Sequence, residues 1–469
     1  MSHSAAEAWK DAAASYVLDQ QSLEADLAAA AYGYDGALDD DYGKLRSEAH
    51  ELRIALESVM LRAGESFVAA VEGGEPAYLS AEQLEEQVIA LDLPLRLHPK
   101  QAAAVILEVL SMPADQTRQH LTRVLDAYTL FSFLQQTPDV QKALSRVFTN
   151  AKIWLDTSTV LPLVAESLID DENKRLETAL LSAASDSGVG LYVTDGVIEE
   201  LRYHIEKCIN YVRQSLRDGE PPFLYAAYML SGRDERQFAA WTADIHGSVH
   251  PDLDIEDYLY TKFQIVRKDL AEVAAKADPK LRAAVTKLFQ EKHNRSHNRQ
   301  DGRLRSPTII NRLVSHDVES VVGVIELRRD SRPELGYEAW WLTLDKTAYR
   351  LKRWLSDNLG KGAPDTPALS PDYLSQLLRL GPLRRSLRSE DAQNLPLIID
   401  VTRLESVPSE LIEVARNTRL SLEGLDERRI RREVRDALHR AHTTLRSNHD
   451  YGSAAQSSVA RRLTAQRNK

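Results

Sequence analysis

The chain has 469 residues, of which 43% are hydrophobic and 28% are charged, and its formal net charge is −11. At about 100–200 residues per domain, this globular composition predicts roughly two to four domains. The single cysteine, Cys208, excludes an internal disulfide and therefore a disulfide-stapled secreted scaffold. No run approaches the roughly 18 apolar residues of a membrane span, and the N-terminus lacks a signal-peptide pattern, so we expect a cytoplasmic protein without a membrane partner.

Charge is distributed unevenly along the chain. Residues 1–150 contain 23 acidic and 11 basic side chains, whereas residues 151–469 contain 47 acidic and 48 basic ones. Within the second part, residues 262–312 carry 13 bases and 5 acids, and residues 401–469 carry 14 bases and 9 acids. Such segregation favours phosphate contacts by the later parts, although solvated helix faces of varying sign give the same pattern.

Residues 1–148 are predicted to form an acidic, all-helical domain. Apolar residues recur at helical spacing in this segment, as in Leu52, Leu56 and Val59. Its residues show no constellation typical of catalysis. We therefore expect this domain to pack against the rest of the chain or to bind a partner, which is either a regulatory protein or a second copy of the chain.

The pattern changes to alternating strands and helices at Ala151. The apolar run 152–155 ends at Asp156, and a helical segment leads to a second strand at 190–193 and a further helix. Such alternation predicts parallel pairing with right-handed crossovers. A third strand is expected at 338–343, just before Asp345.

The connections between these strands are predicted to be mostly helical. Residues 201–292 form a long helical stretch with breaks, the polar segment 293–306 is typical of a mobile loop, and a helix begins near Ser315. His293 and His297 have the spacing of a transition-metal pair, but their Asn, Arg and Ser neighbours favour a solvated basic loop.

The last part of the chain, 381–469, is expected to be a C-terminal helical extension. Residues 396–401 form a further strand candidate. Residues 427–446 have the apolar stripe of an Arg-rich amphipathic helix, and the last twenty or so residues are expected to be disordered.

Four carboxylates occupy positions where an acid is energetically costly. They are Asp156, Glu200, Asp317 and Asp345. Carboxyl ends of parallel strands and helix N-termini meet at one edge of an α/β sheet, so we expect all four to project to one place. Crowded carboxylates repel unless a cation neutralises them, and the cation that suits oxygen ligands and leaves room for phosphate is Mg²⁺ or Mn²⁺.

The segments around these acids resemble the motifs of the PIN-domain nucleases. Residues 153–158 (Ile-Trp-Leu-Asp-Thr-Ser) are similar to the opening strand, and 193–201 are similar to the second motif, in which an acid precedes Leu. Residues 315–317 (Ser-His-Asp) and 341–346 (Trp-Leu-Thr-Leu-Asp-Lys) are similar to the third and fourth motifs. The four motifs occur in the family's order.

The resemblance implies a PIN-like parallel sheet flanked by helices over 149–380, and metal-dependent cleavage of RNA or, in flap-nuclease relatives, of DNA. Asp156, Glu200, Asp317 and Asp345 would then hold the metal. Thr157, Ser158 and Thr343 would support the site by orienting carboxylates or binding phosphate.

Three features depart from the family pattern. The aromatic residue expected three positions after the last acid is Ala348, with Tyr349 one position later. Glu200 and Asp317 lie 117 positions apart, which implies a helical insertion over about 206–312. Glu199 also competes with Glu200 for the place facing the metal, and the sequence leaves this choice open.

These observations favour a Mg²⁺- or Mn²⁺-dependent nuclease, with RNA preferred because of the resemblance. The insertion supplies candidate phosphate contacts in Arg295, Arg299, Arg303 and Arg305. The alternatives are a nuclease for single-stranded or structured DNA, or a non-catalytic PIN-like scaffold that binds nucleic acid or a protein. The chain contains no Gly-rich phosphate loop, so nucleoside triphosphate hydrolysis has no support.

Overall fold

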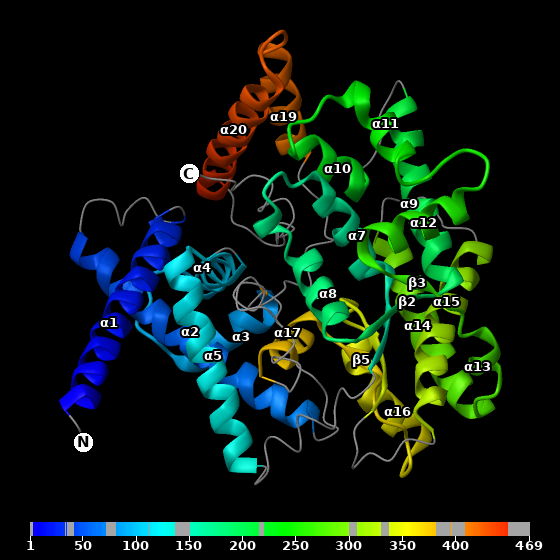
Figure 1. Cartoon of the computed structure of the whole chain (residues 1–469), viewed down its shortest axis with the longest axis horizontal. Helices are drawn as coiled ribbons and strands as arrows, with labels where there is room; N and C mark the ends of the chain where they lie inside the picture. The colour runs from blue at the N-terminus through cyan, green and yellow to red at the C-terminus, as the bar shows by residue number, and fades with distance from the viewer. Residues whose placement is uncertain are drawn as a thin grey trace.

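A computed structural model gives the fold of most of the chain (Figure 1). It describes residues 3–32, 34, 42–71, 81–111, 113–136, 151–214, 220–299, 307–329, 337–380, 395 and 409–448. The described residues form an N-terminal helical unit, a parallel sheet covered by helices, and a C-terminal helical hairpin.

The N-terminal unit is all-helical, as the sequence predicts. Its helices are α1 (His3–Tyr32), α2 (Tyr42–Val71), α3 (Ala81–Leu91), α4 (Pro99–Ser111) and α5 (Asp115–Gln136). They enclose a hydrophobic core of their own, to which the predicted stripe of Leu52, Leu56 and Val59 contributes buried side chains. Contacts with the rest of the chain include a 3.4 Å ion pair between Asp126 on α5 and Arg379.

Within the described residues, the sheet has five strands, all parallel, in the order β3-β2-β1-β4-β5. The strands are β1 (Lys152–Leu155), β2 (Gly190–Val193), β3 (Val266–Arg267), β4 (Ala339–Leu342) and β5 (Ala368–Leu369). The three central strands are those that the sequence predicts. The two edge strands are only two residues long, which is too short to produce a recognisable apolar run.

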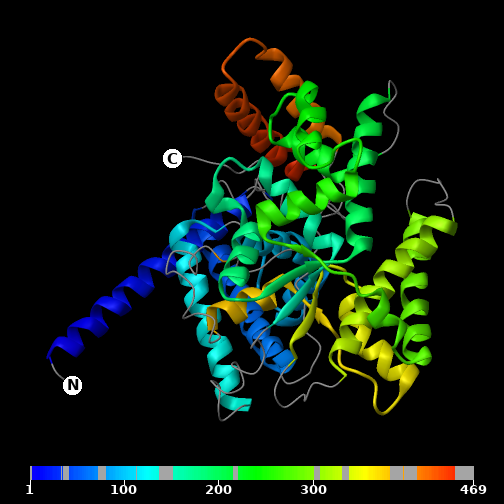
Figure 2. The same ribbon diagram turned by 45° about the vertical axis from the view of Figure 1, so that its right-hand side comes forward.

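Both faces of the sheet are buried at β1 and β4, which explains why residues 153–155 and 339–342 are continuously apolar. Alternate residues of β1 point to opposite faces, so Ile153 and Leu155 enter one core whereas Trp154 enters another. The same alternation places Trp340 in the first core and Trp341 in the second. Figure 2 shows helices gathered on both sides of the strands.

Helices make every connection between successive strands. The first two connections contain α7 (Thr157–Ala165), α8 (Leu176–Asp186), α9 (Asp195–Arg213), α10 (Phe223–Leu230), α11 (Phe238–Ala243) and α12 (Pro251–Phe263). The later segments are α13 (Ala271–Ala275), α14 (Pro279–Arg299), α15 (Pro307–Leu327), α16 (Leu351–Leu359) and α17 (Pro371–Leu380). Short 3₁₀ helices span Glu166–Leu168, Glu172–Lys174, Glu235–Gln237 and Ala348–Arg350.

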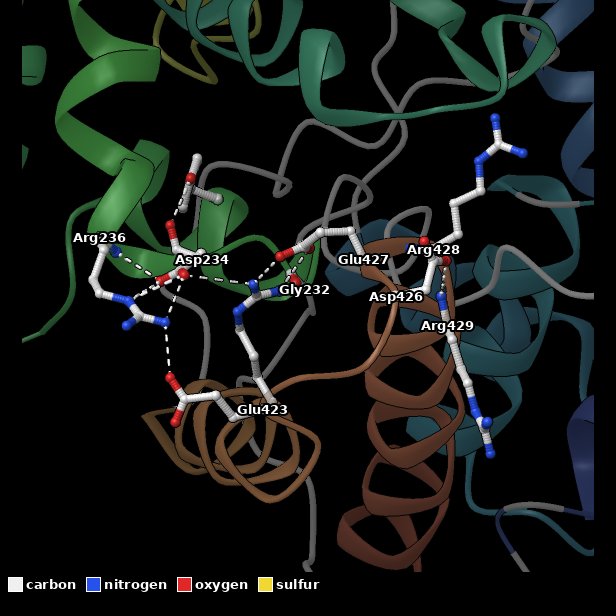
Figure 3. A network of polar contacts seen from close by, with 10 residues as sticks. Gly232, Asp234, Arg236, Glu423, Asp426, Glu427, Arg428 and Arg429 are labelled. Carbon is white, nitrogen blue, oxygen red and sulfur yellow. Dashed lines mark hydrogen bonds and ion pairs between the residues drawn. The ribbon is translucent and has the colours of Figure 1, made fainter.

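The C-terminal extension folds as a hairpin of α19 (Ser409–Ser421) and α20 (Glu427–Asn448) against α10. The predicted apolar stripe of α20 is buried at Ile430, Val434 and Leu438. Charged residues stabilise the end of the hairpin at which α19 connects to α20, as Figure 3 shows. Arg419 donates a 2.7 Å hydrogen bond to the carbonyl oxygen of Gly232 and also pairs with Glu427.

Three predictions about the connections are wrong. The stretch 201–292 is not wholly helical, because β3 interrupts it. Helix α14 continues to Arg299, whereas a loop was expected from 293, and His293 continues its buried face beyond Phe289. Helix α15 begins at Pro307, a residue favoured in a first helical turn, and not near Ser315.

Some expectations concern residues outside those described. They are the strand candidate 396–401, the remainder of the loop at 300–306, and the C-terminal tail beyond residue 448. Among the described helices, none combines the length and apolar composition that crossing a membrane requires.

Candidate active site

The order of the strands reverses between β1 and β4. Strands β2 and β3, which follow β1 in the sequence, lie on one side of β1 in the sheet, whereas β4 and β5 lie on its other side. At such a reversal, the connections that follow the two neighbouring strands run to opposite faces of the sheet. This divergence leaves space for a ligand at the carboxyl ends of the strands. Asp156 directly follows β1, and Asp345 lies three residues after β4, so both belong to this edge.

Hydrogen bonds from both strand ends orient the carboxylate of Asp156. Its backbone N–H donates to the carbonyl oxygen of Leu342 at 2.9 Å, which joins the ends of β1 and β4. Its Oδ2 accepts a 2.5 Å hydrogen bond from Ser158 Oγ and a 2.7 Å hydrogen bond from Thr343 Oγ1. Ser158 and Thr343 therefore stand where they can hold this side chain in one rotamer.

A lysine that the sequence analysis did not assign to the site lies between the acids. The Nζ atom of Lys292, on α14, is 3.1 Å from Asp317 Oδ2 and 2.5 Å from Asp345 Oδ2. Burial disfavours its charge, but attraction by Asp317, Asp345 and Asp156 outweighs burial and raises the pKa of Lys292. One ammonium group thus neutralises carboxylates from three separate segments.

His293, the next residue, also contacts Asp317. Its Nε2 atom lies 2.7 Å from Asp317 Oδ2, and only 8% of the residue is exposed. The interpretation of His293 as part of a solvated loop is therefore wrong. A signal was present in the sequence, because Leu281, Val285 and Phe289 precede His293 at intervals of four and continue one buried helical face.

The acids of the site differ in their affinity for protons. Burial, followed by repulsion from Asp317, raises the pKa of Asp156 to about 7 despite the opposing effect of Lys292. For Asp345, burial acts in the same direction, but attraction by Lys292 outweighs it and the pKa is lowered. Neighbouring carboxyl groups with pKa values displaced in opposite directions are typical of sites that move protons.

Glu200, in the second turn of α9, interacts electrostatically with Asp156, whereas Glu199 contacts Arg312 and His316. The negative charge of Glu200 helps to raise the pKa of Asp156. Burial alone would raise the pKa of Glu200, but His316, whose Nδ1 is 3.4 Å away, and the nearby Thr157 hydroxyl keep it low. Glu199 instead pairs with Arg312 at 2.6 Å, and 31% of its side chain is exposed.

Asp317 reaches the site from the middle of α15, ten residues after the first residue of that helix. The prediction that it lies in a first helical turn is therefore wrong. Helix dipole effects are confined to the end turns, so the partners of Asp317 are Lys292 and His293 and not a helix terminus.

The structure does not describe the predicted phosphate contacts. Arg295 and Arg299 belong to α14, but their side chains lie outside the described part, as do Arg303 and Arg305 entirely. Positions 295 and 299 are three and seven residues after Lys292 in the same helix, and such positions share a helix face. A nucleic acid bound along this face of α14 would lead toward the acids.

The donor chemistry of the site suits a hard divalent cation. Within the described ranges, no three His, Cys, Asp or Glu side chains are arranged as a metal site. However, Lys292 Nζ is a cation held by Asp317 and Asp345 and attracted by Asp156, so it marks a position that carboxylate oxygens can surround. Asp156, Asp317 and Asp345 therefore fit Mg²⁺ or Mn²⁺, provided that Lys292 moves.

The chain was also compared with known proteins. It matches no model of a known protein family, no curated protein and no solved structure.

Proposed function

We propose that this protein is a divalent-metal-dependent nuclease that hydrolyses phosphodiester bonds, with RNA as the preferred substrate. The proposal depends on one observation: Asp317 and Asp345 contact one ammonium group beside β1 and β4, and Asp156, from a third segment, is near enough to interact with it electrostatically. The four PIN-like motifs support it, because each motif contributes an acid to this sheet edge.

The residues of the chain have distinct parts in this proposal. Asp156, Asp317 and Asp345 would hold Mg²⁺ or Mn²⁺, which supplies Lewis-acid activation of water and stabilisation of charge on the phosphate. Ser158 and Thr343 both donate to Oδ2 of Asp156, so its other oxygen is the one oriented toward a ligand. Glu200, held in its ionised form by His316, adds negative charge behind Asp156.

We propose that the N-terminal unit regulates access to this edge, either by itself or through a protein partner. Lys346, the residue after Asp345, lies 3.4 Å from Glu82 on α3. Both side chains are partly exposed, so the pair itself contributes little to stability. It nevertheless places an acidic unit next to the edge where nucleic acid would enter.

The test is metal-dependent cleavage of mixed RNA and single-stranded DNA by the full chain. We expect cleavage with Mg²⁺ or Mn²⁺ and none in EDTA. Asp156→Asn should reduce cleavage to background, because it removes a metal-binding charge and retains the shape of the side chain. Asp357→Asn, at an exposed position of α16, is the matched control and should keep full activity.

Two outcomes would contradict the proposal. Full activity of purified Asp156→Asn protein would show that the site lies elsewhere. Binding of nucleic acid without cleavage under any metal condition would favour the non-catalytic scaffold, and cleavage of DNA alone would correct the substrate.

A further inference from the structure

The ammonium group of Lys292 occupies the centre of the acidic site. It lies 2.5 Å from Asp345 Oδ2 and 3.1 Å from Asp317 Oδ2, and it also attracts Asp156. Its Nζ is 5.1 Å from the centre of the Phe289 ring, which adds a cation–π contact from the same helix.

A divalent cation and this ammonium group cannot bind the same carboxylates together. Magnesium oxygen distances are about 2.0–2.1 Å, so a metal shared by these acids would lie almost where Nζ now lies. Two cations at such separation repel strongly in a partly buried site. Metal binding at this place therefore requires the lysine side chain to leave.

Lys292 is able to leave without unfolding its helix. Its side chain retains 25% exposure, so solvent is reachable from its present position. Lysine carries its charge on a flexible stem of four carbons, whereas His293 remains on Asp317 and keeps that carboxylate in place.

We propose that Lys292 is an internal competitor for the divalent metal, which neutralises the acids when metal is absent and is displaced when metal binds. Lys292 thereby sets the metal concentration at which the site becomes occupied. The displaced ammonium lies on the face of α14 that includes positions 295 and 299, where it can bind a substrate phosphate. This inference rests on the proposed metal site.

The experiment measures Mn²⁺ affinity of the full-length protein by calorimetry, without substrate. Lys292→Met and Lys292→Gln remove the competing charge, so both should bind Mn²⁺ at least about tenfold more tightly than the wild type. Lys292→Arg keeps a positive charge and should not gain affinity. Lys287→Met is the matched control, since Lys287 lies on the same helix over the Trp354 ring, and its affinity should equal that of the wild type.

Removal of Lys292 leaves three acids without their counter-ion, so the variants are expected to be less stable in EDTA. A second readout is therefore the Mn²⁺ concentration that gives half of the maximal rise in melting temperature. It should be lower in Lys292→Gln than in the wild type.

The outcomes separate this inference from the proposed function. Equal or weaker Mn²⁺ binding by both neutral variants, with binding by the wild type intact, overturns the competition and leaves the metal site standing. Absence of Mn²⁺ binding in the wild type and in every variant overturns both. If the double variant Lys292→Met/Asp317→Asn still binds Mn²⁺ more tightly than the wild type, the metal binds at another site. That outcome also overturns the inference.

Discussion

Thr343 donates a 2.7 Å hydrogen bond from Oγ1 to Oδ2 of Asp156, and these residues directly follow the adjacent parallel strands β4 and β1. Thr343 is fully buried, so the hydroxyl has little access to water. The bond therefore connects the carboxyl ends of β1 and β4, between which the strand order reverses. It also orients the carboxylate of Asp156.

Replacement of Thr343 by Val is expected to lower the free energy of unfolding by about 1–2 kcal/mol. Valine has nearly the same shape but no hydroxyl, so the carboxylate of Asp156 loses one of its two donors. Urea unfolding of metal-free protein measures the change. Thr343→Ser retains the hydroxyl and should recover most of the loss, and equal losses in both variants would show that packing alone matters.

The raised pKa of Asp156 makes the stability of the metal-free protein depend on pH. The folded chain holds the Asp156 proton up to a pH of about 7, whereas the unfolded chain releases it near its ordinary pKa of 3.8. Stability therefore falls as pH rises between these values and levels off above them. The side chain of Asp156 is only partly buried, so solvent screens part of its interactions. We therefore expect the free energy of unfolding to fall by about 1–2 kcal/mol between pH 5 and pH 8 as a result of this titration.

Asp156→Asn removes this titration. Unfolding measured at pH 5 and pH 8 in EDTA should show that the variant loses less stability than the wild type over that interval. Identical losses in the two proteins would mean that Asp156 titrates near its ordinary pKa.

Gly196 allows His316 to approach α9. A Cβ atom at position 196 would lie 2.5 Å from His316 Cγ, so Gly196→Ala must displace the imidazole. Since His316 contacts both Glu199 and Glu200, we expect a loss of stability of about 1–3 kcal/mol, together with reduced metal-dependent cleavage.

A double-mutant cycle tests the cause of that loss. In a His316→Ala background the clash is absent, so Gly196→Ala should cost much less there, with a coupling energy within about 0.5–3 kcal/mol. Additive effects of the two substitutions would show that the loss of stability in Gly196→Ala has a cause in α9 other than contact with His316.

The basic end of the insertion is predicted to bind the nucleic-acid backbone. Substitution of Arg295, Arg299, Arg303 and Arg305 by Ala should weaken binding of single strands of any sequence. It should also flatten the dependence of log affinity on log salt by about two to three units, at about 0.7 per contact. Fluorescence anisotropy at several salt concentrations measures the affinity and its salt dependence. An unchanged salt dependence would show that these arginines do not contact the nucleic-acid backbone.

The sequence by itself determined the parallel sheet flanked by helices, and this prediction is confirmed. The central strands were visible because burial on both faces requires continuous apolar runs, and the stripe of α20 was visible because only one side of that helix is buried. The acids after β1 and β4 could be recognised for a related reason: a charge within three residues of the end of a buried strand interrupts an apolar pattern.

Only the tertiary structure decided which groups meet those acids. Nothing local distinguishes Lys292 from a solvated lysine, and the apolar residues at intervals of four before His293 indicate a buried helix face without indicating what that face contacts. The position of Lys292 and His293 beside Asp317 results from the packing of α14 against α15, which lies beyond any sequence window. The choice between Glu199 and Glu200 was decided in the same way, since adjacent helical residues differ in direction by about 100° and only the neighbouring helix determines which direction faces the site.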